Sequence, residues 1–314
     1  MALNARQGGA VACLQVMRTV RIMTPGSKSA GILLMTGLLT LSACGAGADS
    51  PSAEAPGVVR VAAGLYPLAE VVRQVGGDLV QVDDLTPPGA EPHDLELSPP
   101  EIETVDQADL LVVLGGGFQP ALESLAGRNT SLVVAERIAK GSGPPGDPHF
   151  WLDPMTVGEV AGLVADELAR LDEANEGAYR ANTKAFAIEL ASLHEEMEVG
   201  LRDCSTKTLV TAHDSFGWLA SRYGLRAESI AGLSPDQEPD PARLAELTDL
   251  VKEEKVTTVF TETLVSARVA ETLARETGVT TAVLDPLESA PADGGYLEAM
   301  RSNLRVLREG LGCR

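Results

Sequence analysis

Residues 208 to 225 have the sequence TLVTAHDSFGWLASRYGL, which holds a strand, a short loop and a helix in succession. The apolar, β-branched run at 208–211 predicts a buried strand, and the pattern at 215–222 predicts a helix. His213 falls between the two. In sheets of parallel strands, ligands bind in the crevice beyond the carboxyl ends of the strands. His213 is therefore a candidate ligand-binding residue.

The same alternation of short apolar runs and helical segments continues in both directions from this stretch. Towards the C-terminus, strands are predicted at 228–230, 256–260 and 281–284, and helices at 241–254, 266–277 and 296–309. Towards the N-terminus, strands are predicted at 58–62, 80–82, 110–113 and 131–134, and helices at 66–75, 99–106, 118–126 and 155–171. Alternating strands and helices favour parallel sheets. We therefore expect an α/β protein with two four-stranded parallel lobes, an N-terminal lobe at 57–173 and a C-terminal lobe at 204–314.

The segment between the lobes, residues 174–203, has the pattern of one amphipathic linking helix. Apolar side chains recur there at helical spacing, and the segment contains no proline. A helix of this length would extend about 45 Å. If it packs against both lobes, it resists wide hinge opening of the cleft between them. The alternative is two shorter helices interrupted at Gly177 or Gly200.

Composition favours a globular protein and argues against nucleic-acid binding. The 314 residues are 44% hydrophobic and only 4% aromatic, so the core is mostly aliphatic. The formal net charge is −20, which opposes binding to phosphate backbones. An acidic surface attracts cations, but it also serves solubility, so charge alone does not identify a ligand.

The N-terminal region has the features of a bacterial lipoprotein signal peptide. Basic residues precede an apolar run at 31–41 that is too short to span a bilayer as a permanent helix. The run ends in Leu41-Ser42-Ala43-Cys44, which resembles a lipobox. We expect residues 1–43 to be removed, Cys44 to carry the lipid, and residues 44–56 to form a flexible tether. The protein would then be extracytoplasmic and anchored to the cell membrane, whereas a plain signal peptide cleaved after Ala43 would leave it without an anchor.

Two further cysteines, Cys204 and Cys313, follow Cys44 in the predicted mature chain. An even pair in an oxidising compartment is compatible with a disulfide. Neither residue belongs to a CxxC or other metal-binding spacing, so neither is a candidate metal ligand.

Three of the four histidines, together with Asp285, directly follow predicted strands or lie in loops that follow them. Three imidazoles and a carboxylate at the carboxyl ends of parallel strands suggest a metal site formed by His93, His149, His213 and Asp285. The intervals between these residues match no short metal-binding motif. Taken singly, each histidine is more often a structural residue. His194 lies among glutamates in the predicted linking helix, and we expect it on a solvated face.

Six segments, in order along the chain, resemble the zinc- and manganese-binding solute-binding lipoproteins of bacterial ABC importers. They are PGAEPHDLELSP (88–99), DPHFWLDP (147–154), VTAHDSFGWLASRYGL (210–225), VFTETLVS (259–266), LDPL (284–287) and YLEAMRSNLRVL (296–307). The resemblance extends from about residue 58 to the C-terminus. It implies that His93, His149, His213 and Asp285 bind the metal in the cleft, two from each lobe. It also implies two βα lobes joined by a long rigid helix.

The resemblance also bears on which metal is bound. Members that favour manganese typically have a glutamate at the position of His213, and three imidazoles with one carboxylate suit tetrahedral zinc better than manganese. Glu262 matches a family glutamate near the cleft and is expected either to orient a ligand or to be an alternative carboxylate ligand. Asp214 could orient a ligand, although capping the next helix is the preferred interpretation.

The resemblance implies a receptor that is not an enzyme, which captures Zn²⁺ and delivers it to a membrane permease driven by an ATPase. Many zinc members have a histidine-rich loop where this chain has AKGSGPPGD (139–147), so zinc would arrive directly or from a separate zinc chaperone. Three alternatives remain open. They are a manganese- or iron-binding member of the same family, a hydrolase with three histidines and an open fourth position on zinc, and a lipid-anchored adhesin, which explains none of the histidines.

Overall fold

The computed structural model describes residues 57–138, 143–234, 240–264 and 266–314. The predicted signal peptide, the predicted lipidation site Cys44 and the predicted tether lie outside the described residues. Residues Glu54–Arg314 form one compact unit. Among the described residues, no helix has both the length and the apolar character needed to cross a membrane.

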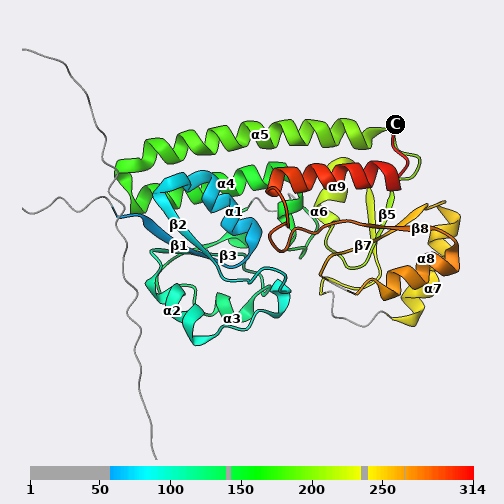
Figure 1. The fold of residues 1–314 in the computed structure, drawn as a ribbon, viewed down its shortest axis with the longest axis horizontal. Coiled ribbons are helices and arrows are strands. Elements are labelled where there is room, and N and C mark those ends of the chain that lie inside the picture. Colours follow the sequence, from blue (N-terminus) through cyan, green and yellow to red (C-terminus); the bar gives the residue numbers. More distant parts are fainter. Residues whose placement is uncertain (1–56, 139–142, 235–239, 265) are drawn as a thin grey trace, which may run out of the picture. The chain divides into compact units, whose positions relative to one another are not determined.

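The first sheet consists of four parallel strands in the order β2-β1-β3-β4 (Figure 1). Its strands are β1 (Val59–Ala63), β2 (Val80–Asp84), β3 (Leu110–Val113) and β4 (Thr130–Val133). The accompanying helices are α1 (Tyr66–Gly76), α2 (Pro99–Gln107), α3 (Pro120–Glu123) and α4 (Pro154–Leu171). Every residue of β3 is buried, as expected for a central strand whose sheet is covered on both faces.

The second sheet repeats this arrangement with the order β6-β5-β7-β8, again entirely parallel. Its strands are β5 (Thr208–Thr211), β6 (Arg226–Ser229), β7 (Thr258–Thr261) and β8 (Thr280–Val283). The helices are α6 (Gly217–Tyr223), α7 (Pro241–Glu253), α8 (Arg268–Thr277) and α9 (Tyr296–Gly310). The predicted fold class, two four-stranded parallel sheets in an α/β protein, is confirmed.

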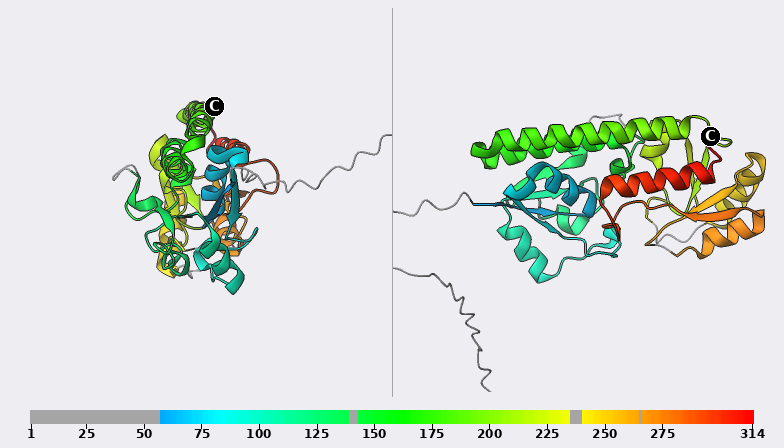
Figure 2. Two further views of the ribbon diagram at one scale, coloured as in Figure 1. Left: turned by 90° about the vertical axis from the view of Figure 1, so that its left-hand side faces the viewer. Right: turned by 45° about the horizontal axis from the view of Figure 1, so that its top comes forward.

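One unbroken helix, α5 (Glu176–Arg202), lies alongside both lobes (Figures 1 and 2). It contacts α1 and α4 of the first lobe and α6 and α9 of the second. The interruption considered at Gly177 or Gly200 does not occur. A methyl group added to Gly200 would lie 2.9 Å from the Leu304 side chain, so this glycine permits the close approach of α5 and α9. Because one hydrophobic core includes side chains from both lobes and from α5, the helix is part of the packing of each lobe.

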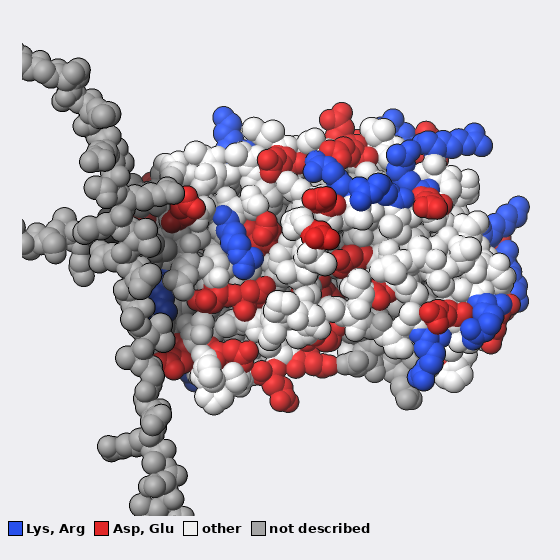
Figure 3. Space-filling view, viewed as in Figure 1, with Lys and Arg blue, Asp and Glu red and all other residues white. Residues whose placement is uncertain are grey.

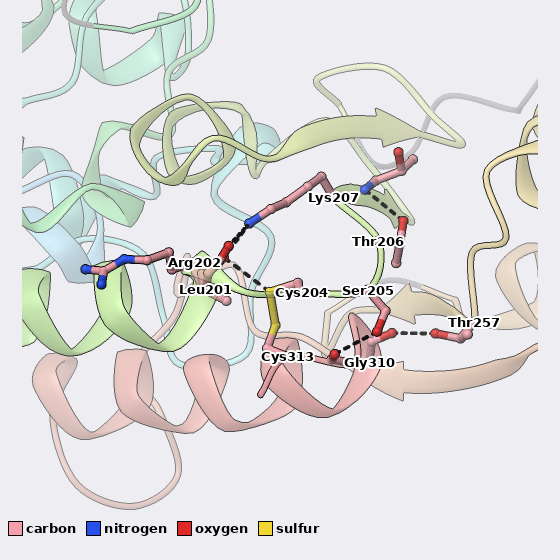
Figure 4. The surroundings of a disulfide bond; sticks show 11 residues. Leu201, Arg202, Cys204, Ser205, Thr206, Lys207, Thr257, Gly310 and Cys313 are labelled. Carbon is pink, nitrogen blue, oxygen red and sulfur yellow. Dashed lines mark hydrogen bonds between the residues drawn. A yellow bond between two sulfur atoms is a disulfide. The ribbon is translucent and has the colours of Figure 1, made fainter.

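Cys204 and Cys313 form a disulfide that ties the chain just after α5 to the C-terminal segment (Figure 4). Main-chain hydrogen bonds run beside it, from Ser205 N to Leu311 O at 3.1 Å and from Arg314 N to Asp203 O at 3.0 Å. The bond closes a loop of 109 residues, which contains the whole second sheet.

Acidic and basic side chains are both spread over the face shown in Figure 3. Acidic groups lie over the part formed by the first lobe, and Lys and Arg gather along the upper edge towards the second lobe and at its far end, with acidic groups among them. This face has no continuous basic surface of the kind that a phosphate backbone needs.

Candidate metal centre

Four side chains from four separate loops meet near the carboxyl ends of the two sheets. His93 lies in a 3-10 turn (Pro92–Asp94) after β2, and His149 directly precedes another (Phe150–Leu152). His213 follows β5, and Glu288 follows β8. The nitrogen or oxygen atoms that these residues offer all lie within 4.8 Å of one another. The structure thus brings together all three histidines that the sequence singled out.

The Oε1 atom of Glu288 is the point at which the three imidazoles converge. It lies 3.1 Å from Nε2 of His149, 3.3 Å from Nε2 of His213 and 3.6 Å from Nε2 of His93. Neighbouring ligands on tetrahedral zinc are separated by roughly 3.3 Å when the metal–ligand bonds are about 2.0 Å long. The three distances from Glu288 bracket this value, so this carboxylate already lies from each histidine at nearly the spacing of two ligands on tetrahedral zinc.

Two of the imidazole nitrogens have no hydrogen-bond partner although they are buried. They are Nε2 of His93 and Nε2 of His213. Unpaired buried polar atoms are costly, and in native proteins they commonly mark a functional site. Their convergence on Glu288 shows that the residues present fit a bound cation.

Asp285, which the sequence predicted as the fourth ligand, is not a member of this cluster; the carboxylate beside the histidines is that of Glu288. Its carboxylate accepts a hydrogen bond from Leu287 N at 2.9 Å, and its main chain exchanges two hydrogen bonds with the Asn303 side chain. The chain then turns at Leu287, where φ is 57°. This left-handed conformation is uncommon for a residue with a side chain. It directs Glu288, rather than Asp285, to the histidines.

The loop that carries Glu288 is held by the first lobe. The indole N–H of Trp151 donates to Pro286 O at 2.7 Å, and Gly89 N donates to the Ser289 hydroxyl oxygen at 2.8 Å. The hydroxyl of Tyr296, at the start of α9, donates to Trp151 O at 2.6 Å. The position of Glu288 therefore depends on contacts between the lobes.

Two carboxylates contact the buried imidazoles at Nδ1, on the side of each ring away from Glu288. Asp147 Oδ1 lies 2.8 Å from Nδ1 of His149, and Glu262 pairs with Nδ1 of His213. Each carboxylate also accepts the main-chain N–H of its own histidine, at 2.9 Å for His149 and 3.0 Å for His213. Such partners hold the imidazole so that Nε2 faces Glu288, the orientation in which it could bind a metal there. Of the two roles expected of Glu262, an orienting partner or an alternative ligand, its contact with Nδ1 of His213 fits the first. Asp147 escaped the sequence analysis, although its position two residues before His149 was a usable signal.

His93 is held differently from the other two histidines. Its ring packs on Phe118 with centroids 4.2 Å apart, and its main-chain N–H donates to Glu91 at 3.2 Å. Gln119, almost fully buried, donates from Nε2 to Pro92 O and to Gly64 O. The His93 side chain is 11% exposed, whereas those of His149 and His213 are 0% and 1% exposed. His93 is therefore the outermost of the three imidazoles.

The electrostatics of the cluster favour positive charge beside Glu288. Burial alone would raise the pKa of Glu288, but the hydrogen bond with His149 and the neighbouring imidazoles of His213 and His93 hold it well below its usual value. Burial alone would lower the pKa of His213, yet its hydrogen bond with Glu262 and the neighbouring carboxylate of Glu288 raise it to about 10. The pKa of His149 is raised in the same way, against the effect of burial, by Asp147 and Glu288. Protons on these imidazoles thus supply the positive charge that the carboxylates need.

Two other residues singled out in the sequence lie outside the cluster. Helix α6 begins at Gly217 with Phe216 as its N-cap, so the expected capping by Asp214 is wrong. Burial, followed by the charge of Asp147, raises the pKa of Asp214. His194 is partly buried on α5, where its Nδ1 lies 3.2 Å from the Tyr223 hydroxyl, so it does not lie on a fully solvated face as expected.

Comparison with known proteins shows similarity to one family over nearly all of the described chain. Residues 61–310 match the family described as ZnuA, zinc-uptake complex component A periplasmic. The high-affinity zinc uptake system protein ZnuA of Bacillus subtilis (strain 168) is 32% identical over 300 residues, which cover 87% of this chain and 94% of that protein. The zinc-binding lipoprotein AdcA of Streptococcus pneumoniae is 32% identical over 288 residues, which cover 83% of this chain but only 58% of AdcA.

Solved structures show the same similarity. The laminin-binding protein Lmb of Streptococcus agalactiae, described as bifunctional with adhesin and metal transporting activity, is 35% identical and has a TM-score of 0.76. The match covers 81% of this chain and 100% of that one. The Zn(II)-bound ZnuA-like domain of S. pneumoniae AdcA is 33% identical with a TM-score of 0.70, covering 81% of this chain and 99% of that one.

Proposed function

The chain belongs to the family of periplasmic zinc-uptake complex component A proteins, and from this premise we propose that it captures Zn²⁺ outside the cytoplasm and passes it to an ABC importer. The observation that carries the proposal is the convergence of three imidazole Nε2 atoms on Glu288 Oε1 between the lobes. His93, His149, His213 and Glu288 are the proposed ligands, with Glu288 in the place first assigned to Asp285.

Zinc is the cargo that suits this set of donors. Three imidazoles and one carboxylate form a nitrogen-rich, four-coordinate site, whereas manganese prefers more oxygen ligands and a higher coordination number. The relatives are named for zinc uptake or zinc binding, which supports the same choice over a manganese- or iron-binding role.

Binding, rather than catalysis, is supported by the position of Glu288. A catalytic zinc site usually has three protein ligands and leaves a fourth position for water. Glu288 is 1% exposed and lies at tetrahedral spacing from the histidines, so it completes the coordination and leaves no such position. The site thus holds zinc without activating water for hydrolysis.

The proposed partners are a membrane permease and the ATPase that drives it. Lipid on Cys44 would keep the receptor at the membrane surface near the permease. Since the segment at 139–147 has no histidine, zinc would arrive directly or from a chaperone rather than through collection by a histidine-rich loop.

Metal analysis of protein purified without chelators tests this function. We expect about one zinc per chain, removable by a strong chelator and restored by added Zn²⁺. Metal bound only by the folded state also raises the melting temperature. Failure of the chelator-treated protein to bind zinc would contradict the proposal, as would tighter binding of manganese than of zinc.

A further inference from the structure

The segment that carries His149 rests on the first turn of α6, which belongs to the second lobe. The indole N–H of Trp218 donates to Asp147 O at 2.9 Å. A methyl group added to Gly217 would lie 2.4 Å from Asp147 Oδ2 and 3.1 Å from Pro144 Cγ. A methyl group added to Gly143 would lie 2.4 Å from the Trp218 ring. Residues 143–149 and α6 are therefore in close contact at several points.

Asp147 links this contact between the lobes to His149. Its Oδ1 atom lies 2.8 Å from Nδ1 of the imidazole and accepts the His149 main-chain N–H, while Oδ2 faces Gly217. The Asp147 side chain is only 6% exposed. One buried carboxyl group thus touches both a proposed metal ligand and the opposite lobe.

The far end of α6 is fastened to the same part of the first lobe. Arg222 donates from Nε to Asp153 Oδ1 at 2.9 Å, and a second bond joins its Nη2 to Oδ2. Asp153 in turn caps α4, accepting a hydrogen bond from Met155 N. Both ends of α6 therefore contact residues 143–153, so a displacement of α6 would act on the whole segment around His149.

We infer that Asp147 is a positioning residue, through which docking of α6 sets the orientation of His149 and thereby the retention of zinc. The inference rests on the proposed function, because it takes His149 to be a zinc ligand. With α6 docked, Trp218 and Gly217 hold Asp147 where its carboxylate fixes the imidazole with Nε2 towards the metal. With α6 displaced, Asp147 loses both supports and His149 is no longer held. Movement of the second lobe therefore loosens a ligand that belongs to the first.

The test is a substitution in the second lobe that touches no proposed ligand. In Gly217→Ala, the new methyl group must displace Asp147 or Pro144. We expect zinc to dissociate about tenfold faster or more, within the range seen when partners of metal ligands are altered. Gly162→Ala in α4 is the matched control, since nothing lies within 4 Å of its added methyl group, and it should leave the rate unchanged. Trp218→Phe removes the hydrogen bond to Asp147 O together with part of the ring that packs near Gly143, and should act in the same direction.

Three readouts separate positioning from general damage. The zinc dissociation rate is measured by rapid mixing with excess chelator, the melting temperature is measured without metal, and the visible spectrum of the Co²⁺-substituted protein reports the coordination geometry. We expect Gly217→Ala to change the zinc dissociation rate and the Co²⁺ spectrum far more than the melting temperature. In an Asp147→Ala background, adding Gly217→Ala should have a much smaller effect, since the closest contact, that with Asp147 Oδ2, is gone and residues that act together are not additive.

The outcomes distinguish this inference from the proposed function. If the wild-type protein does not bind zinc, the proposed function itself fails. If the wild type binds zinc but Gly217→Ala and Trp218→Phe release it at the wild-type rate, only the inference is overturned. Fully additive effects of Asp147→Ala and Gly217→Ala, or an equal effect of Gly162→Ala, would overturn it as well.

Discussion

Glu288 Oε1 lies 3.1 Å from His149 Nε2, although 139 residues separate the two in the chain. This contact joins the last loop of the second lobe to the last long loop of the first. Because Glu288 also meets His213 and His93, one carboxylate oxygen contacts ligands from both lobes. The proposed site therefore exists only when the two lobes are together.

The two carboxylates of the Glu288 loop can be distinguished by paired substitutions. Glu288→Gln replaces an anionic ligand with a neutral amide, so we expect zinc affinity to fall by a factor of about 10 or more. Asp285→Asn keeps an oxygen that can accept the hydrogen bond from Leu287 and should change affinity less than about threefold. Competition titration against a chelator of known affinity measures both. If Asp285→Asn lowers zinc affinity more than Glu288→Gln does, Asp285 rather than Glu288 is the ligand.

Metal preference is expected to depend on His213. His213→Glu exchanges an imidazole for a hard oxygen donor and also places a third carboxylate beside Glu262 and Glu288. Zinc should bind more weakly, and manganese relatively better, in titrations of both metals. His194→Ala is the control, because His194 pairs with Tyr223 away from the cluster. If His194→Ala lowers zinc affinity as much as His93→Ala does, the ligand set is wrong.

Zinc binding is expected to release protons at neutral pH. The pKa of His213 is raised to about 10, so below that pH its Nε2 carries a proton that zinc must displace. Apparent zinc affinity should rise as pH increases towards 10, by about tenfold per pH unit for each displaced proton. Calorimetry at pH 7.5 in buffers of different ionisation enthalpy should give at least one proton released per zinc. If no proton is released on zinc binding, His213 is not protonated in the metal-free protein as we expect.

In the protein without metal, the same ion pairs make the free energy of unfolding fall as pH increases, whereas zinc affinity is expected to rise. Because the folded-state pKa of His213 is raised above its ordinary value of 6.5, the pair contributes stability that is fully present below pH 6.5. That contribution is lost as pH rises towards 10. Urea unfolding of the metal-free protein across this range should show it, and His213→Ala should flatten the dependence.

Removal of the disulfide should weaken the fold but not the metal site. Replacing Cys204 and Cys313 with serine frees a closed loop of 109 residues, and native disulfides typically contribute about 2–4 kcal/mol. The free energy of unfolding should fall by about this amount in the serine variant, and also in the wild-type protein when reductant is added, as measured by urea denaturation. Zinc affinity should remain near the wild-type value. A large loss of affinity in the serine variant would mean that the disulfide helps to position the ligands.

The sequence predicts the parts of this structure that depend on local patterns. Buried runs such as 110–113 and 208–211 are strands because their side chains suit a sheet covered on both faces, and the three histidines follow strands or lie in loops after them. The long helix follows from its apolar periodicity. The choice between Asp285 and Glu288 depends on the backbone turn at Leu287, which no residue pattern signals because Leu rarely adopts a positive φ. Likewise, α3 covers only Pro120–Glu123 of the predicted 118–126, and Gln119 at its N-cap donates instead to Pro92 O in the His93 loop.

A crystal structure of the zinc-loaded protein, with the metal located by its anomalous scattering, tests the central claim most directly. We expect one zinc bound at about 2.0–2.2 Å by Nε2 of His93, His149 and His213 and by a carboxylate oxygen of Glu288. The carboxylates of Asp147 and Glu262 should remain on the Nδ1 atoms of their histidines. Zinc bound by three histidines and a water molecule, with Glu288 turned away, would contradict the closed site and favour a catalytic one. Zinc bound elsewhere on the protein would contradict the account as a whole.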